Sequence, residues 1–275
     1  MSITKRTRKL SYQWYPENPV EIKKFIEDNI NSVKSTKNNF AAIVPHAGWN
    51  FSGSLAVKVI SSLYSKPDTI IVIGGHLPAG SSLLYSPEDV FETPLGYLNS
   101  DKQIISKIIS EIDVEEDISS DNTVEIILPI IKYFYPETDI VCLRIGSGSE
   151  AINLGSIIYQ ISKNLKKSVL IIGSTDLTHY GRNFSFSPLG SGDKAVEWVK
   201  YVNDKKIIYE MLTMNYKGVL DSANNDFSAC SSGAVSAAIK FAVLSGINSG
   251  KLIGYLNSYD IVPSESFVGY TGLTY

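Results

Sequence analysis

The 275-residue sequence is poor in the residues that usually build metal or disulfide sites, with only three histidines and two cysteines. Two cysteines permit one disulfide at most, which excludes a disulfide scaffold. The formal net charge of −3 gives no excess of positive charge of the kind that binds nucleic acid. No stretch of about 18 residues is apolar without interruption, so we expect no membrane span. Because the basic residues 5–9 are followed by LSYQW rather than an apolar signal region, we expect a cytoplasmic protein.

The composition nevertheless supports a substantial folded core. Hydrophobic residues make up 44% of the chain and charged residues 19%, which argues against global disorder. No Pro/Ser-rich linker separates two halves, and no internal repeat is present. We interpret the short Ser-rich and Asn-rich patches near Gly190 and Asn224 as surface loops. The sequence therefore predicts a single domain over residues 1–275.

Apolar, β-branched runs alternate with segments of helical spacing along the chain. The runs predict strands at residues 40–44, 69–73, 139–143, 168–172, 251–256 and 267–270. The helical spacing predicts helices at residues 54–64, 101–109, 124–134, 150–164, 193–201, 205–214 and 231–244. This alternation is typical of an α/β fold with a mostly parallel or mixed central sheet covered by helices.

Each of the three histidines follows a predicted strand. His46 lies in VPHAGW, His76 in IGGHLP and His179 in STDLTHYG. In an open α/β sheet, ligands bind in the crevice outside the carboxyl ends of the strands. A satisfied loop residue is the simple reading of any single histidine, but three scarce imidazoles at three strand ends predict one shared site.

The two cysteines lie in different surroundings. Cys142 is in an apolar run and is expected to be a small buried core residue. Cys230 stands at the start of the predicted helix 231–244, where the positive helix end favours a thiolate. His46, His76 and Cys230 would supply two imidazoles and one anion to a metal and leave coordination positions open. Such ligands suit iron, copper or zinc rather than magnesium or calcium.

The spacing of Asp176 and His179, Asp-x-x-His after a strand, allows three interpretations. His179 is an acid/base residue oriented by the carboxylate, the two are additional metal ligands, or Asp176 caps a turn with His179 packed nearby. A hydrolase using His179 with Ser174, Ser231 or Ser232 is a weaker alternative, because the chain has no G-x-S-x-G motif.

Aromatic residues are abundant, and several lie in or near the motif loops. Among them, Trp49 and Tyr180 are candidates for the walls of an apolar pocket around the histidines, although loop aromatics also commonly pack on the core. A pocket of this kind gives a second functional hypothesis, in which the protein binds a peptide or small ligand without turning it over.

Several motifs, taken in chain order, resemble the Memo family. They are PHAGW with SG at residues 45–53, GH at 75–76, FETPLG at 91–96, STDLTHYG at 174–181, and Cys230 before Gly233. The early WYP and the late GYTGL fit as well, so the resemblance covers nearly the whole chain. It implies a fold like that of the class III extradiol (LigB-type) dioxygenases, with a site at the strand ends.

Carried onto this sequence, the resemblance implies that His46, His76 and Cys230 are metal ligands, with Cys230 where the dioxygenases place a carboxylate. It also implies that His179 is the acid/base residue, with Asp176 beside it. The metal would be iron or copper, with zinc as a further candidate. Eukaryotic Memo relatives are linked to cell-motility signalling and peptide recognition, which makes a small molecule or peptide the expected partner.

The chain departs from the family pattern at residues 121–129 (DNTVEIILP). Asn122 and Ile127 stand where the family often has histidines, while Glu125 is kept and is expected to face the site or pair with a neighbour. A thiolate ligand is softer than a carboxylate and is itself oxidisable, which favours Cu(I), zinc or thiolate-bound iron. We therefore expect a metal-dependent oxidoreductase or a dioxygenase-like activity. The cysteine ligand argues against inferring ring cleavage directly from the resemblance in fold.

Overall fold

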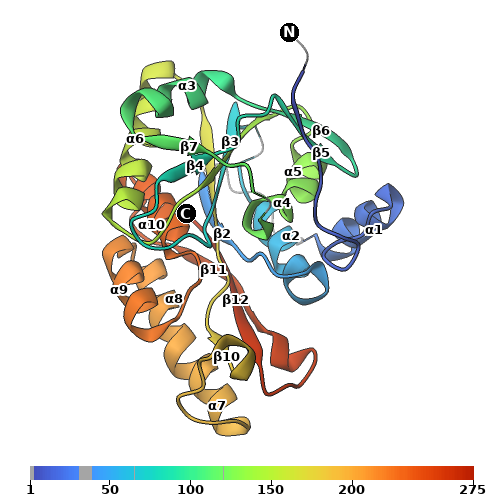
Figure 1. Cartoon of the computed structure of the whole chain (residues 1–275), viewed down its shortest axis with the longest axis vertical. Coiled ribbons are helices and arrows are strands. Elements are labelled where there is room, and N and C mark those ends of the chain that lie inside the picture. The colour runs from blue at the N-terminus through green and yellow to red at the C-terminus, as the bar shows by residue number, and fades with distance from the viewer. Residues whose placement is uncertain (1–2, 31–38, 65, 120) are drawn as a thin grey trace.

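The computed structural model describes residues 3–30, 39–64, 66–119 and 121–275, and the fold is a single α/β domain (Figure 1). Among these residues, the main sheet runs in the order β10-β12-β2-β9-β3-β8-β4-β7, with β11 paired to β12. Its strands are β2 (Ala41–Val44), β3 (Thr69–Gly74), β4 (Leu83–Tyr85), β7 (Val114–Glu116), β8 (Asp139–Arg144), β9 (Val169–Ser174), β10 (His179–Tyr180), β11 (Lys251–Asn257) and β12 (Phe267–Thr274).

The centre of the sheet is parallel and its flanks are antiparallel. Strand β9 lies between β2 and β3 and is parallel to both, and β3 is parallel to β8. Strands β12 and β4 run antiparallel to the parallel block on its two sides. The carboxyl ends of β2, β9 and β3 therefore meet at one edge of the sheet, where the motif segments begin. The expected mixed sheet is confirmed.

Helices cover both faces of the sheet, which Figure 1 shows nearly on edge. They are α1 (Pro19–Asn29), α2 (Ser54–Ile60), α3 (Lys102–Glu111), α4 (Asn122–Glu125), α5 (Leu128–Phe134), α6 (Ser149–Leu165), α7 (Asp193–Trp198), α8 (Asp204–Leu212), α9 (Tyr216–Asp226) and α10 (Ser232–Leu244). Alternate residues of a strand point to opposite faces. Ile71 and Ile73 of β3 thus join one core with α6 and α10, whereas Ile70 and Val72 join the other with α1, α2 and α5. Coverage on both sides explains why these strands are apolar throughout.

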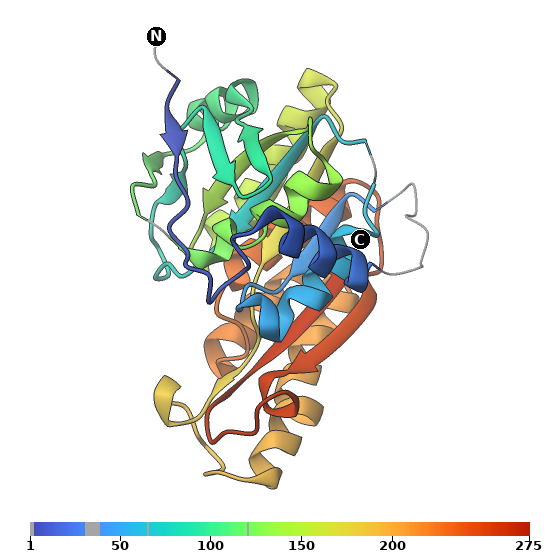
Figure 2. The same cartoon turned by 90° about the vertical axis from the view of Figure 1, so that its right-hand side faces the viewer.

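A small second sheet lies against the body of the protein (Figure 2). It contains β1 (Lys5–Arg6), β5 (Val90–Thr93) and β6 (Gly96–Asn99) in the order β1-β5-β6. Strand β1 pairs with β5 in parallel, with Lys5 opposite Val90. These two residues are far apart in the sequence, and only the tertiary structure brings them together. The sequence pattern did not predict these short strands, because two to four residues carry too little periodicity.

Two predicted segments differ from the structure. The helix expected over residues 124–134 is divided into α4 and α5, and Pro129 lies in the first turn of α5. Proline lacks the N–H that a continuous helix would need and is tolerated there only because that N–H has no helical partner. The Asn-rich patch near Asn224 is not a loop but part of α9, whose Val219, Leu220 and Ala223 are buried. No helix in the described part of the chain is long and apolar enough to cross a membrane.

A buried carboxyl group joins α8 to the segment that carries His179. Asp204 accepts hydrogen bonds from the Thr178 amide at 3.1 Å, from the Thr178 hydroxyl, and from the Tyr255 hydroxyl at 2.7 Å. Burial raises the pKa of Asp204 to about 7. The folded protein therefore holds this proton over a pH range in which the unfolded chain has released it.

We predict that Asp204→Asn reduces the pH dependence of thermal stability. Because the folded pKa lies above the unfolded value, the contribution of Asp204 to stability falls as the pH rises from about 4 to about 7. The wild-type melting temperature should therefore fall more than that of the variant between pH 5 and pH 8, by an extra shift of the order of 5 °C. Circular dichroism melts measure this, and the other titrating groups cancel in the difference. Equal falls in both proteins would contradict the assignment.

Candidate metal centre

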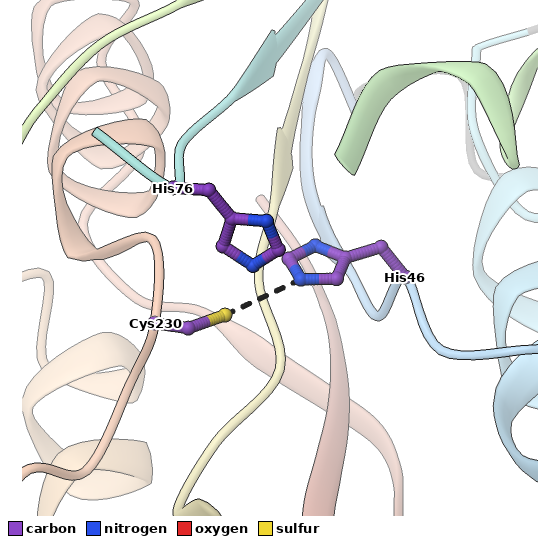
Figure 3. Close-up of side chains that lie close together, drawn as sticks. All are labelled: His46, His76 and Cys230. Carbon is purple, nitrogen blue, oxygen red and sulfur yellow. Dashed lines mark hydrogen bonds between the residues drawn. The ribbon is translucent and has the colours of Figure 1, made fainter. Parts of the chain in front are cut away.

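His46, His76 and Cys230 converge at the carboxyl edge of the sheet (Figure 3). His46 and His76 each stand two residues beyond a strand, β2 and β3, and Cys230 stands two residues before α10. Their ligand atoms lie within 4.8 Å of one another. The sulfur of Cys230 is 3.3 Å from Nε2 of His46, and the two imidazole rings meet edge to face with centroids 4.9 Å apart.

The backbone around Gly75 makes this convergence sterically feasible. A Cβ atom on Gly75 would lie 2.9 Å from Cα of Ser231, so only glycine lets the end of β3 approach the segment that carries Cys230. His76 itself has a left-handed backbone with φ of 58°. That conformation is uncommon for a residue with a side chain, and such strain is concentrated at functional sites.

His46 is fixed by its neighbours on several sides. Its Nδ1 lies 3.0 Å from the Ser174 hydroxyl, and its backbone N–H donates to Oδ1 of Asp176 at 2.8 Å. The side-chain amide of Asn122 donates to the His46 carbonyl at 2.9 Å. These contacts leave Nε2 of the buried imidazole facing Cys230.

His76 is held in the same manner by a carboxylate. Its Nδ1 lies 3.1 Å from Oδ2 of Asp121, and Asp121 is held in turn by the Thr123 amide at 2.8 Å and by Arg144 at 3.6 Å. Metal-ligating histidines in proteins almost always use their second nitrogen in this way, which fixes the ring and raises its basicity. Both imidazoles therefore have the outer contacts of ligands, with Nε2 left for an ion.

Electrostatics at the cluster favour an ionised thiol. Burial alone would raise the pKa of Cys230, but the charge of His46 and the hydrogen bonds from His46 and His76 hold it well below its usual value. The hydrogen bond to Asp121, followed by the one to Cys230, raises the pKa of His76 to about 10. Burial opposes protonation of His46, yet Asp176 and Cys230 together raise its pKa. The electrostatics of the cluster therefore favour a thiolate at Cys230 and positive charge on the two imidazoles.

The three side chains also fit a transition-metal ion. Bonds of about 2.0–2.3 Å to nitrogen and sulfur place neighbouring ligand atoms roughly 3.3–3.8 Å apart, and the sulfur of Cys230 and Nε2 of His46 already have that separation. The ligand atom of His76 lies within 4.8 Å of both. His46 is buried, Cys230 is partly buried and His76 is exposed, so the cluster has an open side toward solvent. An ion would replace the protons on the two imidazoles.

His179 belongs to the same neighbourhood, but its contacts differ from those expected. Its Nδ1 lies 3.0 Å from the Leu177 carbonyl, which only accepts, so Nδ1 carries the proton and Nε2 is left without it in the neutral ring. Its charge helps to lower the pKa of Cys230. Asp176 contacts His46 instead, through the 2.8 Å bond and with Oδ2 at 3.9 Å from Nε2. The backbone at Leu177, and not Asp176, orients His179.

The two aromatic residues expected to wall the site are occupied elsewhere. Trp49 is buried in a core cluster, where its indole N–H donates to the Ile126 carbonyl at 3.1 Å and its ring packs on Phe25. Tyr180 is fully buried and stacks on Phe267 with ring centroids 5.0 Å apart. The expectation that these two residues wall the site is therefore corrected. Large aromatic rings stabilise the fold more when they are buried in the core than when they face solvent in a loop.

Glu125 and the candidate serines also make contacts other than those expected. The carboxylate of Glu125 accepts from the backbone N–H groups of Lys9 and Leu10 and from the Tyr15 hydroxyl, so it fastens the N-terminal segment rather than facing the cluster. Ser174 contacts His46, and Ser231 contacts Cys230 at 3.6 Å. No described serine is hydrogen-bonded to His179, which removes the support for a serine hydrolase.

Sequence reasoning missed Asp121 and Ser174 as partners of the two imidazoles. Asp121 is the N-cap residue of α4, and its side chain accepts a hydrogen bond from the backbone N–H of Thr123. The sequence alone therefore indicates only a helix start at Asp121. Its distance of 45 residues from His76 gives no local signal of their contact. Cys142, in contrast, is buried in the core as predicted.

The comparisons with known proteins agree with this architecture. The sequence profile of the family described as Memo-like protein matches residues 6–274. The chain belongs to the Memo family. A MEMO1 family protein of Pyrococcus furiosus is 28% identical over 95% of each chain, and one of Thermococcus onnurineus is 30% identical over 92% of each. The crystal structure of the uncharacterized protein JW3007 from Escherichia coli K12 has a TM-score of 0.55 at 13% identity and covers 85% of this chain and 98% of its own, which shows a shared fold.

We predict that Cys230 in the metal-free protein reacts with iodoacetamide at pH 6, because the imidazoles keep its thiolate populated below the usual thiol range. His46→Ala removes the largest stabilising charge, so the pKa of Cys230 rises and the alkylation rate at pH 6 falls by about tenfold or more. Mass spectrometry after timed quenching measures the rate. Cys142 serves as the internal control, since its burial keeps it unreactive. An alkylation rate that rises only above pH 8 in the wild type would contradict this account.

Proposed function

We propose that this Memo-family protein binds one redox-active transition metal ion, iron or copper, through His46, His76 and Cys230, and that it acts as a metal-dependent oxidoreductase. The observation that supports the proposal is the convergence of two imidazoles and a thiolate within 4.8 Å, each imidazole with its other nitrogen already hydrogen-bonded. Two imidazoles and a thiolate are soft enough for Cu(I) or thiolate-bound iron, and zinc is the non-redox alternative.

Charge balance supports a divalent or monovalent cation at this position. Asp176 is buried beside His46, and burial raises the pKa of its carboxyl group. Once the imidazoles give up their protons to bind a metal, the Cys230 thiolate would lose the positive charge beside it, and burial already disfavours a second charge at Asp176. A cation held by the three ligands compensates the thiolate, which is less costly than leaving buried charges unpaired.

The remaining residues have roles that do not depend on which metal is bound. A redox metal with open coordination positions would exchange electrons with a bound small molecule. The exposed side at His76 admits the molecule, and the Leu177 carbonyl keeps Nε2 of His179 available to accept or return a proton. The proposed substrate class is therefore a small molecule that exchanges both electrons and protons, such as a catechol.

We predict that protein purified without oxygen and titrated with Fe(II) or Cu(I) binds about one ion per chain, and that His46→Ala and Cys230→Ala each lose this binding. Removing one of three ligands leaves too few donors to hold the ion. Elemental analysis after gel filtration measures the metal content. His179→Ala is the matched control, because it removes an imidazole from the same neighbourhood but no ligand, and it should retain the metal.

Either of two results would overturn the metal proposal: equal metal content in the wild type and Cys230→Ala, or no stoichiometric metal in the wild type at any pH between 6 and 8. Tight binding of Zn(II) together with no stable binding of iron or copper would overturn the redox assignment. If metal binds but no catechol, peroxide or O₂ is consumed by the loaded protein, the oxidoreductase assignment fails and metal binding alone stands.

We predict that Asp121→Asn weakens metal binding without abolishing it. Asp121 touches no metal ligand atom but fixes the ring of His76, and loss of such an outer partner typically lowers metal affinity by about 10- to 100-fold. Competition with a chromophoric chelator measures the dissociation constant. Asp89→Asn, at an exposed carboxylate held by Thr4 and Lys102, is the control and should leave the affinity unchanged. Equal affinities in all three proteins would show that Asp121 does not position His76.

A further inference from the structure

Arg144 is a buried charged residue at the end of β8, a strand that is otherwise mostly apolar. Only 6% of its surface is exposed. The register of the sheet places Arg144 opposite Gly74 of β3, two residues before His76. Burying a guanidinium is costly, and a buried ion pair often stabilises a fold no better than apolar residues of the same size. The position of Arg144 beside the metal cluster therefore calls for a role other than packing.

The guanidinium of Arg144 contacts two separate parts of the chain at once. Its Nε–H donates to the carbonyl of Gly75 at 3.1 Å. Its Nη1 donates to the Ser119 hydroxyl at 2.7 Å and lies 3.3 Å from Oδ1 of Asp117. Its Nη2 lies 3.6 Å from Oδ2 of Asp121. A planar guanidinium with donors on all three nitrogens can hold these partners together, whereas an ammonium group is a single point charge.

Two of these contacts bear on His76. The Gly75 carbonyl belongs to the peptide group that precedes His76, so its hydrogen bond fixes the plane from which the His76 backbone turns. The N–H of Gly75 is held as well, by the Thr123 hydroxyl at 3.3 Å. The left-handed φ of 58° at His76 is a sparsely populated conformation, which persists only where the surroundings impose it. Asp121 is the carboxylate that lies 3.1 Å from Nδ1 of His76 and so fixes its ring.

Arg144 is itself held in place from the N-terminal strand. Arg6 of β1 donates to the Asp117 carbonyl at 2.7 Å and lies 3.7 Å from its carboxylate. On its other side, Arg6 lies 3.3 Å from Glu88. The charges of this row alternate in sign in the order Glu88, Arg6, Asp117, Arg144 and Asp121. Carboxylates on both sides of Arg144 compensate its charge and keep its guanidinium on the Gly75 carbonyl.

We propose that Arg144 is a positioning residue of the metal site, which fixes the backbone turn and the ring of His76 without touching a ligand atom. The proposal rests on the proposed function, because it gives Arg144 a role toward the ion that His76 would hold. Arg144 acts through the geometry of three donors and not through its charge alone. Arg144→Lys keeps the charge but cannot hold the Gly75 carbonyl and both carboxylates together.

The first test compares metal affinity in the wild type, Arg144→Lys and Lys167→Met, each as the full chain. Lys167→Met is the matched control, because Lys167 also pairs with a buried carboxylate, Asp101 at 2.6 Å. Asp101 bonds Thr69 at the start of β3, so this pair lies at the edge of the sheet opposite the cluster. Fe(II), Cu(I) and Zn(II) are titrated without oxygen against a chromophoric chelator, which gives the dissociation constants.

We expect Arg144→Lys to bind the ion about tenfold or more weakly than the wild type, because the loss of an outer contact to a ligating histidine has an effect of that size. Lys167→Met should keep the wild-type affinity even if its melting temperature falls. A difference between these two variants separates the positioning of His76 from a general loss of stability.

The imidazole signals of the metal-free protein give a second readout that does not depend on metal binding. The chain has three histidines, so labelling them with ¹⁵N gives a small set of ring signals in an NMR spectrum. In the wild type and Lys167→Met, the Nδ1–H of His76 should be protected from exchange with solvent by Asp121. In Arg144→Lys it should exchange at least tenfold faster. The ring of His46 has no printed contact with Arg144 and serves as the internal control.

Signals of the wild type keep the test decisive if Arg144→Lys does not fold. The Nε–H of Arg144 should be protected from exchange in the metal-free protein and should shift when the ion binds, and failure of either would overturn the proposal. Equal metal affinity and equal exchange at His76 in the wild type and Arg144→Lys would also overturn it. Equal losses in Arg144→Lys and Lys167→Met would do the same, since they would show only the effect of a lost ion pair.

The two proposals fail separately. If the wild type binds no metal, the proposed function fails, and the exchange of the His76 ring proton still decides whether Arg144 positions that side chain. If the wild type and Arg144→Lys bind metal equally well, the role of Arg144 fails and the metal site stands.

Discussion

The contact between the sulfur of Cys230 and Nε2 of His46, 3.3 Å long, is the interaction on which the rest of the site depends. A partly buried thiolate needs positive charge close by, and here two imidazoles with raised pKa values provide it. The same three atoms are the donors that a transition metal would use. Protons and the proposed metal ion would therefore compete for one set of side chains, and either would offset the negative charge of Cys230.

The fold brings these side chains together through strand order. Because β9 lies between β2 and β3 with all three parallel, His46, Asp176 and His76 emerge at one edge of the sheet. The segment before α10 then reaches that edge over Gly75, where a side chain would collide with Ser231. Outer contacts from Ser174 and Asp121 set the ring orientations, so the protein itself fixes the geometry of the cluster.

Sequence periodicity predicted the central strands and most of the helices because those segments are long and consistently apolar, as in β3, whose residues are all buried. It also placed His46, His76 and Cys230 together, since strand ends of a parallel sheet converge. It failed for Trp49, Tyr180 and Glu125, whose residue types suit a site and a packed core equally well. The role of Asp121 depends on a contact with His76 across 45 residues of sequence, which no local pattern encodes.

X-ray absorption spectroscopy at the metal edge tests the central claim most directly. The account predicts, for the ion bound by the anaerobically loaded protein, one sulfur neighbour at about 2.3 Å and two imidazole nitrogens at about 2.0–2.1 Å. The sulfur contribution should be absent when the same ion is offered to Cys230→Ser. A first shell made only of nitrogen and oxygen in the wild type would contradict the claim that Cys230, His46 and His76 hold the metal.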